Sequence, residues 1–152
     1  MVSIGGDSYR LVVRRTKRLD IGSGTLPTGD INCDLDPTTK PTVCCDAHFL
    51  PFREKIFGIA YSASTIEHVR HPSHMLHEME RVSSRVMVLA PHWLSRYAKA
   101  PTHLWSFHVS WFTKQGYSCK IKLAEFRFLI FGYTRINEIE ATKNINECRE
   151  VD

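Results

Sequence analysis

Short apolar runs separated by glycine and proline turns predict an alternation of strands and helices along this chain. The segments expected to be strands are, in order, 18–21, 30–35, 42–45, 56–61, 85–90, 117–126 and 128–133. Residues 30–35 alternate polar and apolar side chains, which is typical of a half-buried strand. Residues 85–90 are apolar almost throughout, which predicts a strand buried on both faces.

Segment 72–82 predicts an amphipathic helix, because Pro72 suits a first helical turn and an apolar stripe follows at helical spacing. That stripe consists of Met75, Leu76, Met79 and Val82. A shorter helix is expected over 110–115, closed by Gly116. The first helix separates two predicted strands, so the pattern indicates a β-α-β unit with parallel neighbours and an α/β sheet.

The length of 152 residues and a hydrophobic share of 43% fit one globular domain with a single core. We expect residues 18–135 to form that core, after a basic lead-in over 1–17. The polar tail over 136–152 is expected to be frayed or helical. No apolar run approaches the roughly 20 residues needed to span a bilayer, so no membrane association is predicted.

The net charge of +4 permits nucleic-acid binding without demanding it. Basic residues gather over 10–18, and a solvated face is the favoured interpretation of that cluster. The five cysteines form no CxxC pair, and the start of the chain lacks the basic and apolar regions of a secretory signal. We therefore expect a reduced, cytoplasmic protein without a metal centre, in which Cys33, Cys44 and Cys45 are small buried apolar residues.

Acidic and glycine residues follow the first three predicted strands, at the sheet edge where α/β proteins bind ligands. Asp20 precedes a Gly-Ser-Gly turn over 22–24, Asp34 closes the second strand, and Asp46 follows the third. A carboxylate at the end of a second strand suits the two hydroxyls of a ribose. Taken alone, each of these acids also fits an ordinary turn.

A nicotinamide-binding site is disfavoured by the spacing of these residues. Its fingerprint needs a third glycine where Pro27 stands, and an acid about 20 residues further on. Asp34 comes too early, and no crossover helix fits before it.

The order of several motifs resembles the class I S-adenosylmethionine-dependent methyltransferases, in particular their type 11 methyltransferase-domain family. The motifs are LDIGSG at 19–24, the acid Asp34, DAHFLPF at 46–52, EHV at 67–69, and the helix 72–82 that carries Glu78 and Arg81. The resemblance covers about residues 18–92. It implies a single Rossmann-like α/β domain with a mostly parallel sheet.

The chain departs from that family pattern between its first two strands. Residues 25–29 are too few for the usual crossover helix, which we expect to be shortened or missing. Leu26 stands in place of a third glycine, and Gly58 in place of a usual acid. The cofactor pocket should therefore be open on one side, which leaves a place for a protein partner.

The resemblance implies S-adenosylmethionine as cofactor, with the glycine turn at its methionine portion, Asp34 at the ribose and Asp46 at the adenine. The residues it assigns to cofactor binding are Asp20, Gly22, Ser23, Gly24, Asp34, Asp46, Ala47, Phe49 and Ser62. Asp36 is a second candidate for the ribose.

The methyl acceptor has no distinctive motif, because Ser-Ala-Ser-Thr at 62–65 replaces an Asn-Pro-Pro-Tyr element. A small-molecule acceptor is favoured. His68, His92 and His103 are candidates for a general base, since imidazole titrates near neutral pH. A non-catalytic methyltransferase-like module and a nucleic-acid-directed enzyme remain alternatives; the latter would bind less tightly as salt rises.

Overall fold

A single seven-stranded sheet organises the chain in the computed structural model, which describes residues 17–128 and 131–145, and the side chains of 17–123 and 138–145. The strands are β1 (Arg18–Ile21), β2 (Ile31–Asp34), β3 (Val43–Cys44), β4 (Ile59–Ala63), β5 (Arg85–Pro91), β6 (Ser118–Phe128) and β7 (Phe131–Asn144). The helices are α1 (Pro72–Val82) and α2 (Val109–Thr113), with 3-10 turns η1 (Pro37–Thr39) and η2 (Arg96–Lys99). None of the helices in these ranges has both the length and the apolar character to cross a membrane.

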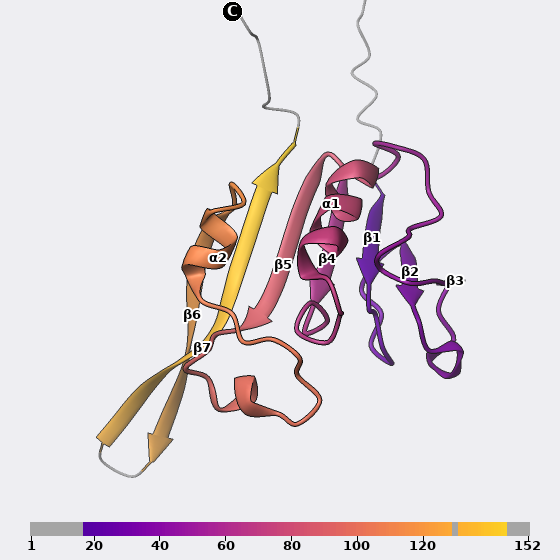
Figure 1. Ribbon diagram of the computed structural model, residues 1–152. Coiled ribbons are helices and arrows are strands. Elements are labelled where there is room, and N and C mark those ends of the chain that lie inside the picture. The colour runs from indigo at the N-terminus through magenta and orange to yellow at the C-terminus, as the bar shows by residue number, and fades with distance from the viewer. Residues whose placement is uncertain (1–16, 129–130, 146–152) are drawn as a thin grey trace, which may run out of the picture.

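The strand order is β3-β2-β1-β4-β5-β7-β6, and every pairing from β3 to β5 is parallel (Figure 1). Only β7 runs antiparallel to its neighbours β5 and β6. The predicted α/β class and mostly parallel sheet are therefore confirmed. The chain adds strands on one side of β1 and then returns to the other, so a switch point lies between β1 and β4, where α/β sheets bind ligands.

The missing crossover helix is also confirmed, because residues 22–30 contain only turns and bends. Asp20 fixes this short connection by binding Thr28. The backbone N–H and the hydroxyl of Thr28 donate to Oδ2 of Asp20 at 2.7 and 2.8 Å. A compact loop thus replaces the helix that would otherwise cover the sheet beside β1.

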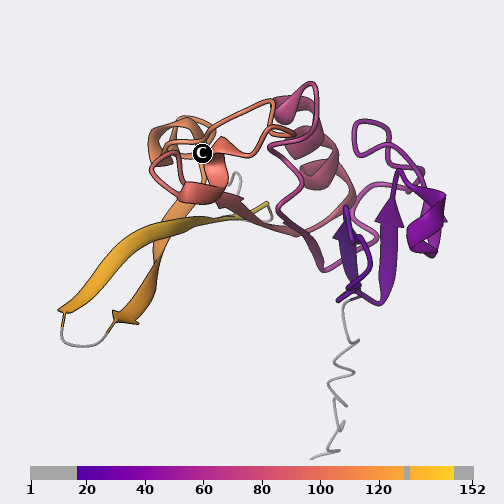
Figure 2. The ribbon, with the colours of Figure 1, turned by 90° about the horizontal axis from the view of Figure 1, so that it is seen from below.

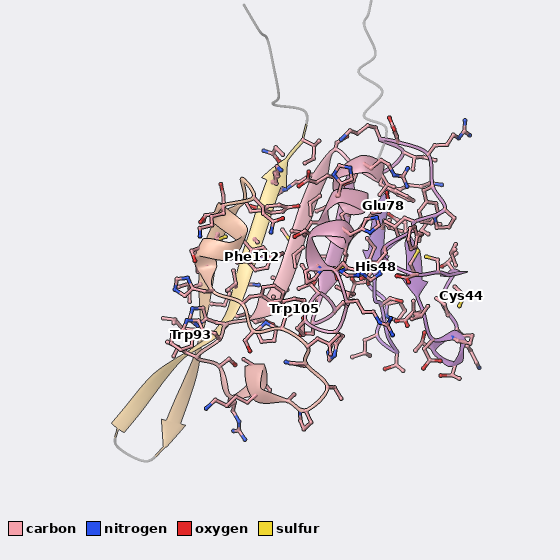
Figure 3. All side chains as sticks on the ribbon, in the orientation of Figure 1. Cys44, His48, Glu78, Trp93, Trp105 and Phe112 are labelled. Atoms are coloured by element: carbon pink, nitrogen blue, oxygen red, sulfur yellow. The ribbon has the colours of Figure 1, made fainter. Side chains whose placement is uncertain are left out.

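Both helices lie on one face of the sheet (Figure 1, Figure 2). The apolar stripe of α1 predicted from its spacing is buried, as are the β-strand side chains that face it, such as Val86 and Val88. Phe112 of α2 is fully buried against Phe107 and Tyr117 (Figure 3).

Strand β5 corrects one prediction, since it is not buried on both faces. Val86, Val88 and Ala90 are buried, whereas Met87 and Leu89 on the opposite face are only half-buried. The reason is that no described helix covers that face. Cys44 is likewise exposed rather than buried, because β3 is the edge strand of the sheet (Figure 3).

The tail provides the largest correction. Its first part was expected to be frayed or helical, yet β7 continues to Asn144 and pairs with both β5 and β6. Ile139 and Ala141 are fully buried on one face of β7. Strand β4 also starts at Ile59, later than predicted. The basic lead-in up to residue 16 and residues 146–152 lie outside the described residues.

Candidate functional site

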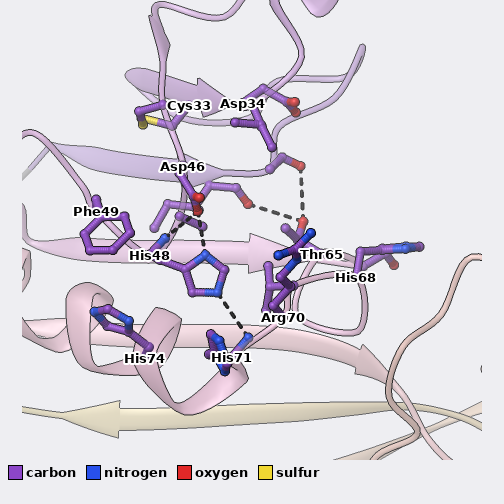
Figure 4. A pocket seen from close by; sticks show the side chains of 17 residues that line it. Cys33, Asp34, Asp46, His48, Phe49, Thr65, His68, Arg70, His71 and His74 are labelled. Atoms are coloured by element: carbon purple, nitrogen blue, oxygen red, sulfur yellow. Dashed lines mark hydrogen bonds and ion pairs between the residues drawn. The ribbon is translucent and has the colours of Figure 1, made fainter.

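A cavity of about 800 Å³ opens at the carboxyl ends of β1, β2, β3 and β4 (Figure 4). Five of the nine predicted cofactor-binding residues line it, namely Gly22, Asp34, Asp46, Ala47 and Phe49. His68, one of the three predicted base candidates, lines it as well. These predicted residues, which follow different strands, therefore line one cavity.

The glycine turn after β1 adopts a backbone conformation that other residues resist. Gly22 has a φ of +69°, and a Cβ there would lie 2.2 Å from Oγ1 of Thr65. Gly24 has a φ of +52°, with open space where a Cβ would stand. The turn therefore needs glycine for its conformation at both positions, and at Gly22 also for close approach.

Asp34 is held rigidly at the end of β2. Its Oδ2 accepts the backbone N–H of Gly24 at 2.7 Å, and its Oδ1 accepts that of Asp36 at 2.9 Å. Each oxygen keeps a second lone pair for another donor. The carboxylate is thereby oriented at the cavity wall before any ligand arrives.

Asp46 and two histidines form a hydrogen-bonded chain along another wall (Figure 4). Oδ1 of Asp46 accepts the backbone N–H of His48 at 2.9 Å and lies 2.6 Å from its Nδ1. The Nε2 of His48 accepts the backbone N–H of His71 at 3.2 Å, so the neutral ring carries its proton on Nδ1. The pKa of Asp46 lies below its usual value, chiefly because of the His48 amide.

Aromatic and imidazole rings line the outer part of the cavity. Phe49 is 70% exposed and meets His74 edge-on, with ring centroids 5.2 Å apart. His48 packs against both His71 and His74. Sequence reasoning missed these three histidines; the only signal was their position beside Asp46 and at the start of α1.

Four predicted residues do not line the cavity. Asp20 is buried and anchors Thr28, while the Ser62 hydroxyl donates to the Ile21 carbonyl at 2.9 Å. The Ser23 hydroxyl is buried without a hydrogen-bond partner among the described residues. Gly24 acts through its N–H on Asp34. These four residues are not part of the cavity lining, and their contacts support the segments that form it.

Helix α1 holds the segment after Asp46 in place. Glu78 accepts the Leu50 N–H at 2.9 Å and forms an ion pair with Arg81, which also donates to the carbonyls of Leu50 and Phe52. The hydrogen bond from Arg81 is the main cause that lowers the pKa of Glu78. The motif residues at 78 and 81 therefore position the loop that carries the adenine-side candidates.

A second cavity of about 390 Å³ adjoins the first and shares Ser64 with it. His103 lines it together with Glu67, and the rings of His103 and His68 lie 4.7 Å apart. His92 is buried and lines neither cavity. The structure thus brings two of the three predicted histidines together. The sequence indicates Glu67 only as part of the EHV motif and gives no role to its side chain.

Comparisons with known proteins agree with this geometry. A family model described as a methyltransferase domain matches residues 10–85, which is half of the chain. No curated protein sequence matches.

Several solved structures share the fold at low sequence identity. A SAM-dependent methyltransferase of Thermotoga maritima superposes with a TM-score of 0.68 at 14% identity, covering 88% of this chain and 84% of its own. A SAM-dependent methyltransferase of Aquifex aeolicus gives 0.55 at 13% identity, covering 84% and 81%. A chain from the complex of the Haloferax volcanii Trm112 methyltransferase activator with a methyltransferase gives 0.60 at 11% identity, covering 84% and 81%.

Proposed function

The chain belongs to the methyltransferase-domain family, and from that premise we propose that it binds S-adenosylmethionine in the cavity of about 800 Å³ and methylates a small molecule. The observation that carries the proposal is the Asp34 carboxylate, which two backbone amides hold at the cavity wall. The same two contacts also fix the turns beside Asp34, and its carboxylate oxygens keep lone pairs that a ligand in the cavity can use.

Asp34 is the residue that would hold the ribose. A diol presents two O–H donors, and the free lone pairs of the two carboxylate oxygens can accept both. Because the Gly24 and Asp36 amides already fix the carboxylate, little side-chain freedom is lost when the ligand binds.

Asp46, Ala47 and Phe49 would hold the adenine. Both contacts from His48 use Oδ1 of Asp46, so Oδ2 has no protein donor among the described residues and can accept an exocyclic amine. Phe49 offers an exposed aromatic face to a flat base. The hydrogen bonds of His48 with Asp46 and with the His71 backbone hold this wall in place.

The methionine portion would lie against the Gly22 turn, where the absence of a side chain permits close backbone approach. The bound cofactor supplies an activated methyl group on a sulfonium. The task left to the protein is to hold the acceptor in line with that methyl group and to exclude water. The second cavity, which shares Ser64 with the first, is the place we assign to the acceptor.

Calorimetric titration with S-adenosylmethionine and S-adenosylhomocysteine tests the cofactor site. We expect micromolar binding, which corresponds to roughly -8 kcal/mol. Asp34→Asn should weaken it by about 1–3 kcal/mol, because one acceptor of a charged hydrogen bond is lost.

Asp30→Asn is the matched control. Asp30 accepts the backbone N–H of Arg18 near the start of β2 and does not line the cavity. Its variant should bind like the wild type. If neither ligand binds at millimolar concentration, or if both variants bind equally, the assignment of this cavity is wrong.

A further inference from the structure

Three metal-ligating side chains gather where the two cavities meet. Glu67, His68 and His103 each present one ligand atom, and these atoms all lie within 4.8 Å of one another. The Oε1 of Glu67 and the Nε2 of His103 are 4.0 Å apart. Two imidazoles and one carboxylate are a common donor set for divalent transition metals.

The strongest support comes from Glu67, a buried acid that has no hydrogen-bond partner among the described side chains. Its side chain is 1% exposed, and neither carboxylate oxygen accepts a hydrogen bond from the described residues. Burial of an unsatisfied carboxylate is costly, so such groups are usually paired or bind a metal. Glu138 lines the same cavity and brings a second carboxyl group close to the three side chains.

His68 has the hydrogen-bond support that metal-bound histidines usually have. The Nδ1 of His68 lies 3.0 Å from the Thr102 carbonyl and donates to it, which leaves the lone pair on Nε2. A backbone carbonyl on the far nitrogen is the usual support of a metal-bound histidine.

We propose that Glu67, His68 and His103 bind one divalent transition-metal ion, with zinc as the best match to their nitrogen and oxygen donors. Ligands around a tetrahedral zinc stand roughly 3.3 Å apart for bonds of about 2.0–2.1 Å. The 4.0 Å between Glu67 Oε1 and His103 Nε2 is longer than this value, so binding would require the two side chains to move closer. His68 is exposed and provides a route from solvent.

Three protein ligands leave a fourth coordination position open. Glu67 lines the second cavity with His103, and His68 lines the first, so the site lies where the two cavities meet. The metal site stands on these side chains alone and does not depend on methyl transfer. Sequence spacing gives no hint of it, because His103 lies far along the chain from the Glu-His pair.

Zinc binding to the chelator-treated protein, measured by competition with a chromophoric chelator, tests the site. We expect one high-affinity zinc per chain. His68→Ala, His103→Ala and Glu67→Gln should each weaken that binding at least tenfold. His77→Ala is the control, because His77 is an exposed histidine of α1 outside both cavities, and it should leave the affinity unchanged.

Cobalt(II) substitution distinguishes these ligands from the cysteines. The expected spectrum has visible d–d bands without a thiolate-to-cobalt charge-transfer band. A thiolate band, an affinity equal in wild type and His68→Ala, or no zinc binding would each overturn the proposal. Circular dichroism checks that each variant folds. If the buried Glu67 or the half-buried His103 proves necessary for folding, the variant of the exposed His68 still tests the site.

Discussion

At the scale of single residues, the floor of the main cavity depends on one close contact between two loops. The Gly22 turn after β1 lies against Thr65 after β4, so close that a Cβ at Gly22 would be 2.8 Å even from the Cβ of Thr65. Thr65 in turn donates from Oγ1 to nearby carbonyls of the same loops. The absence of a side chain at Gly22 thus lets the segments that follow the paired ends of β1 and β4 lie in contact beside the cavity.

Gly22→Ala should therefore destabilise the protein more than Gly24→Ala. Both glycines have positive φ, which costs an alanine about 1–2 kcal/mol, but only Gly22 lacks space for a Cβ. Steric overlap should add about 1–3 kcal/mol at Gly22. Urea unfolding of the two variants measures the difference, and equal losses would show that the contact with Thr65 relaxes without cost.

The sequence identifies part of this site, because motifs after parallel strands converge at one edge of the sheet. Gly22, Asp34 and Asp46 are examples. The proximity of Glu67 and His103 escapes such reasoning, because the approach of two loops distant in sequence brings these side chains together. Asp20 and Ser62 were identified by position alone, and the structure places both behind the cavity wall.

At the scale of elements, β7 shows where local polarity misleads. Its second half alternates charged and apolar residues, with Glu138 and Glu140 beside Ile139 and Ala141. The charged side chains give the segment a polar composition, yet the period of two places Ile139 and Ala141 in the core. The pairing of β7 with β5 depends on strands far away in sequence, which a local reading does not include.

Ile139→Ala should cost about 2–5 kcal/mol of unfolding free energy, because it removes a fully buried side chain from the sheet. Ile121→Ala is the control, since Ile121 lies directly opposite on β6 but is 45% exposed at the sheet edge. Its loss should be much smaller. Chemical denaturation of both variants checks this, and similar losses would argue against β7 as a core strand.

At the scale of the whole molecule, the short β1–β2 connection contains no helix that could cover the main cavity on that side. Leu26 and Leu35 are exposed there, at 83% and 69%. The cavity is nevertheless built from segments along the described part of the chain between β1 and α1. A ligand held by Asp34, Asp46 and the Gly22 turn would therefore stabilise the fold as a unit.

Thermal unfolding with S-adenosylhomocysteine measures that coupling. At a concentration one hundred times the dissociation constant, binding adds about 2.7 kcal/mol to the free energy of unfolding. For a domain of this size, that should raise Tm by about 5–10 °C. Asp34→Asn at the same ligand concentration should give about half that rise or less, since a tenfold weaker site gains only about 1.4 kcal/mol.

The interpretation of this result depends on the loop that replaces the crossover helix between β1 and β2. A full rise in the isolated chain would show that the loop over 22–30 suffices in place of a crossover helix. Unchanged Tm in wild type at millimolar ligand would contradict the cofactor proposal for the chain alone. Repeating the titration with Leu26→Ser, a change at an exposed position that lines neither cavity, separates surface effects from the cavity itself. This variant should keep the full rise, because the ligand contacts lie on the strand ends rather than on the exposed loop.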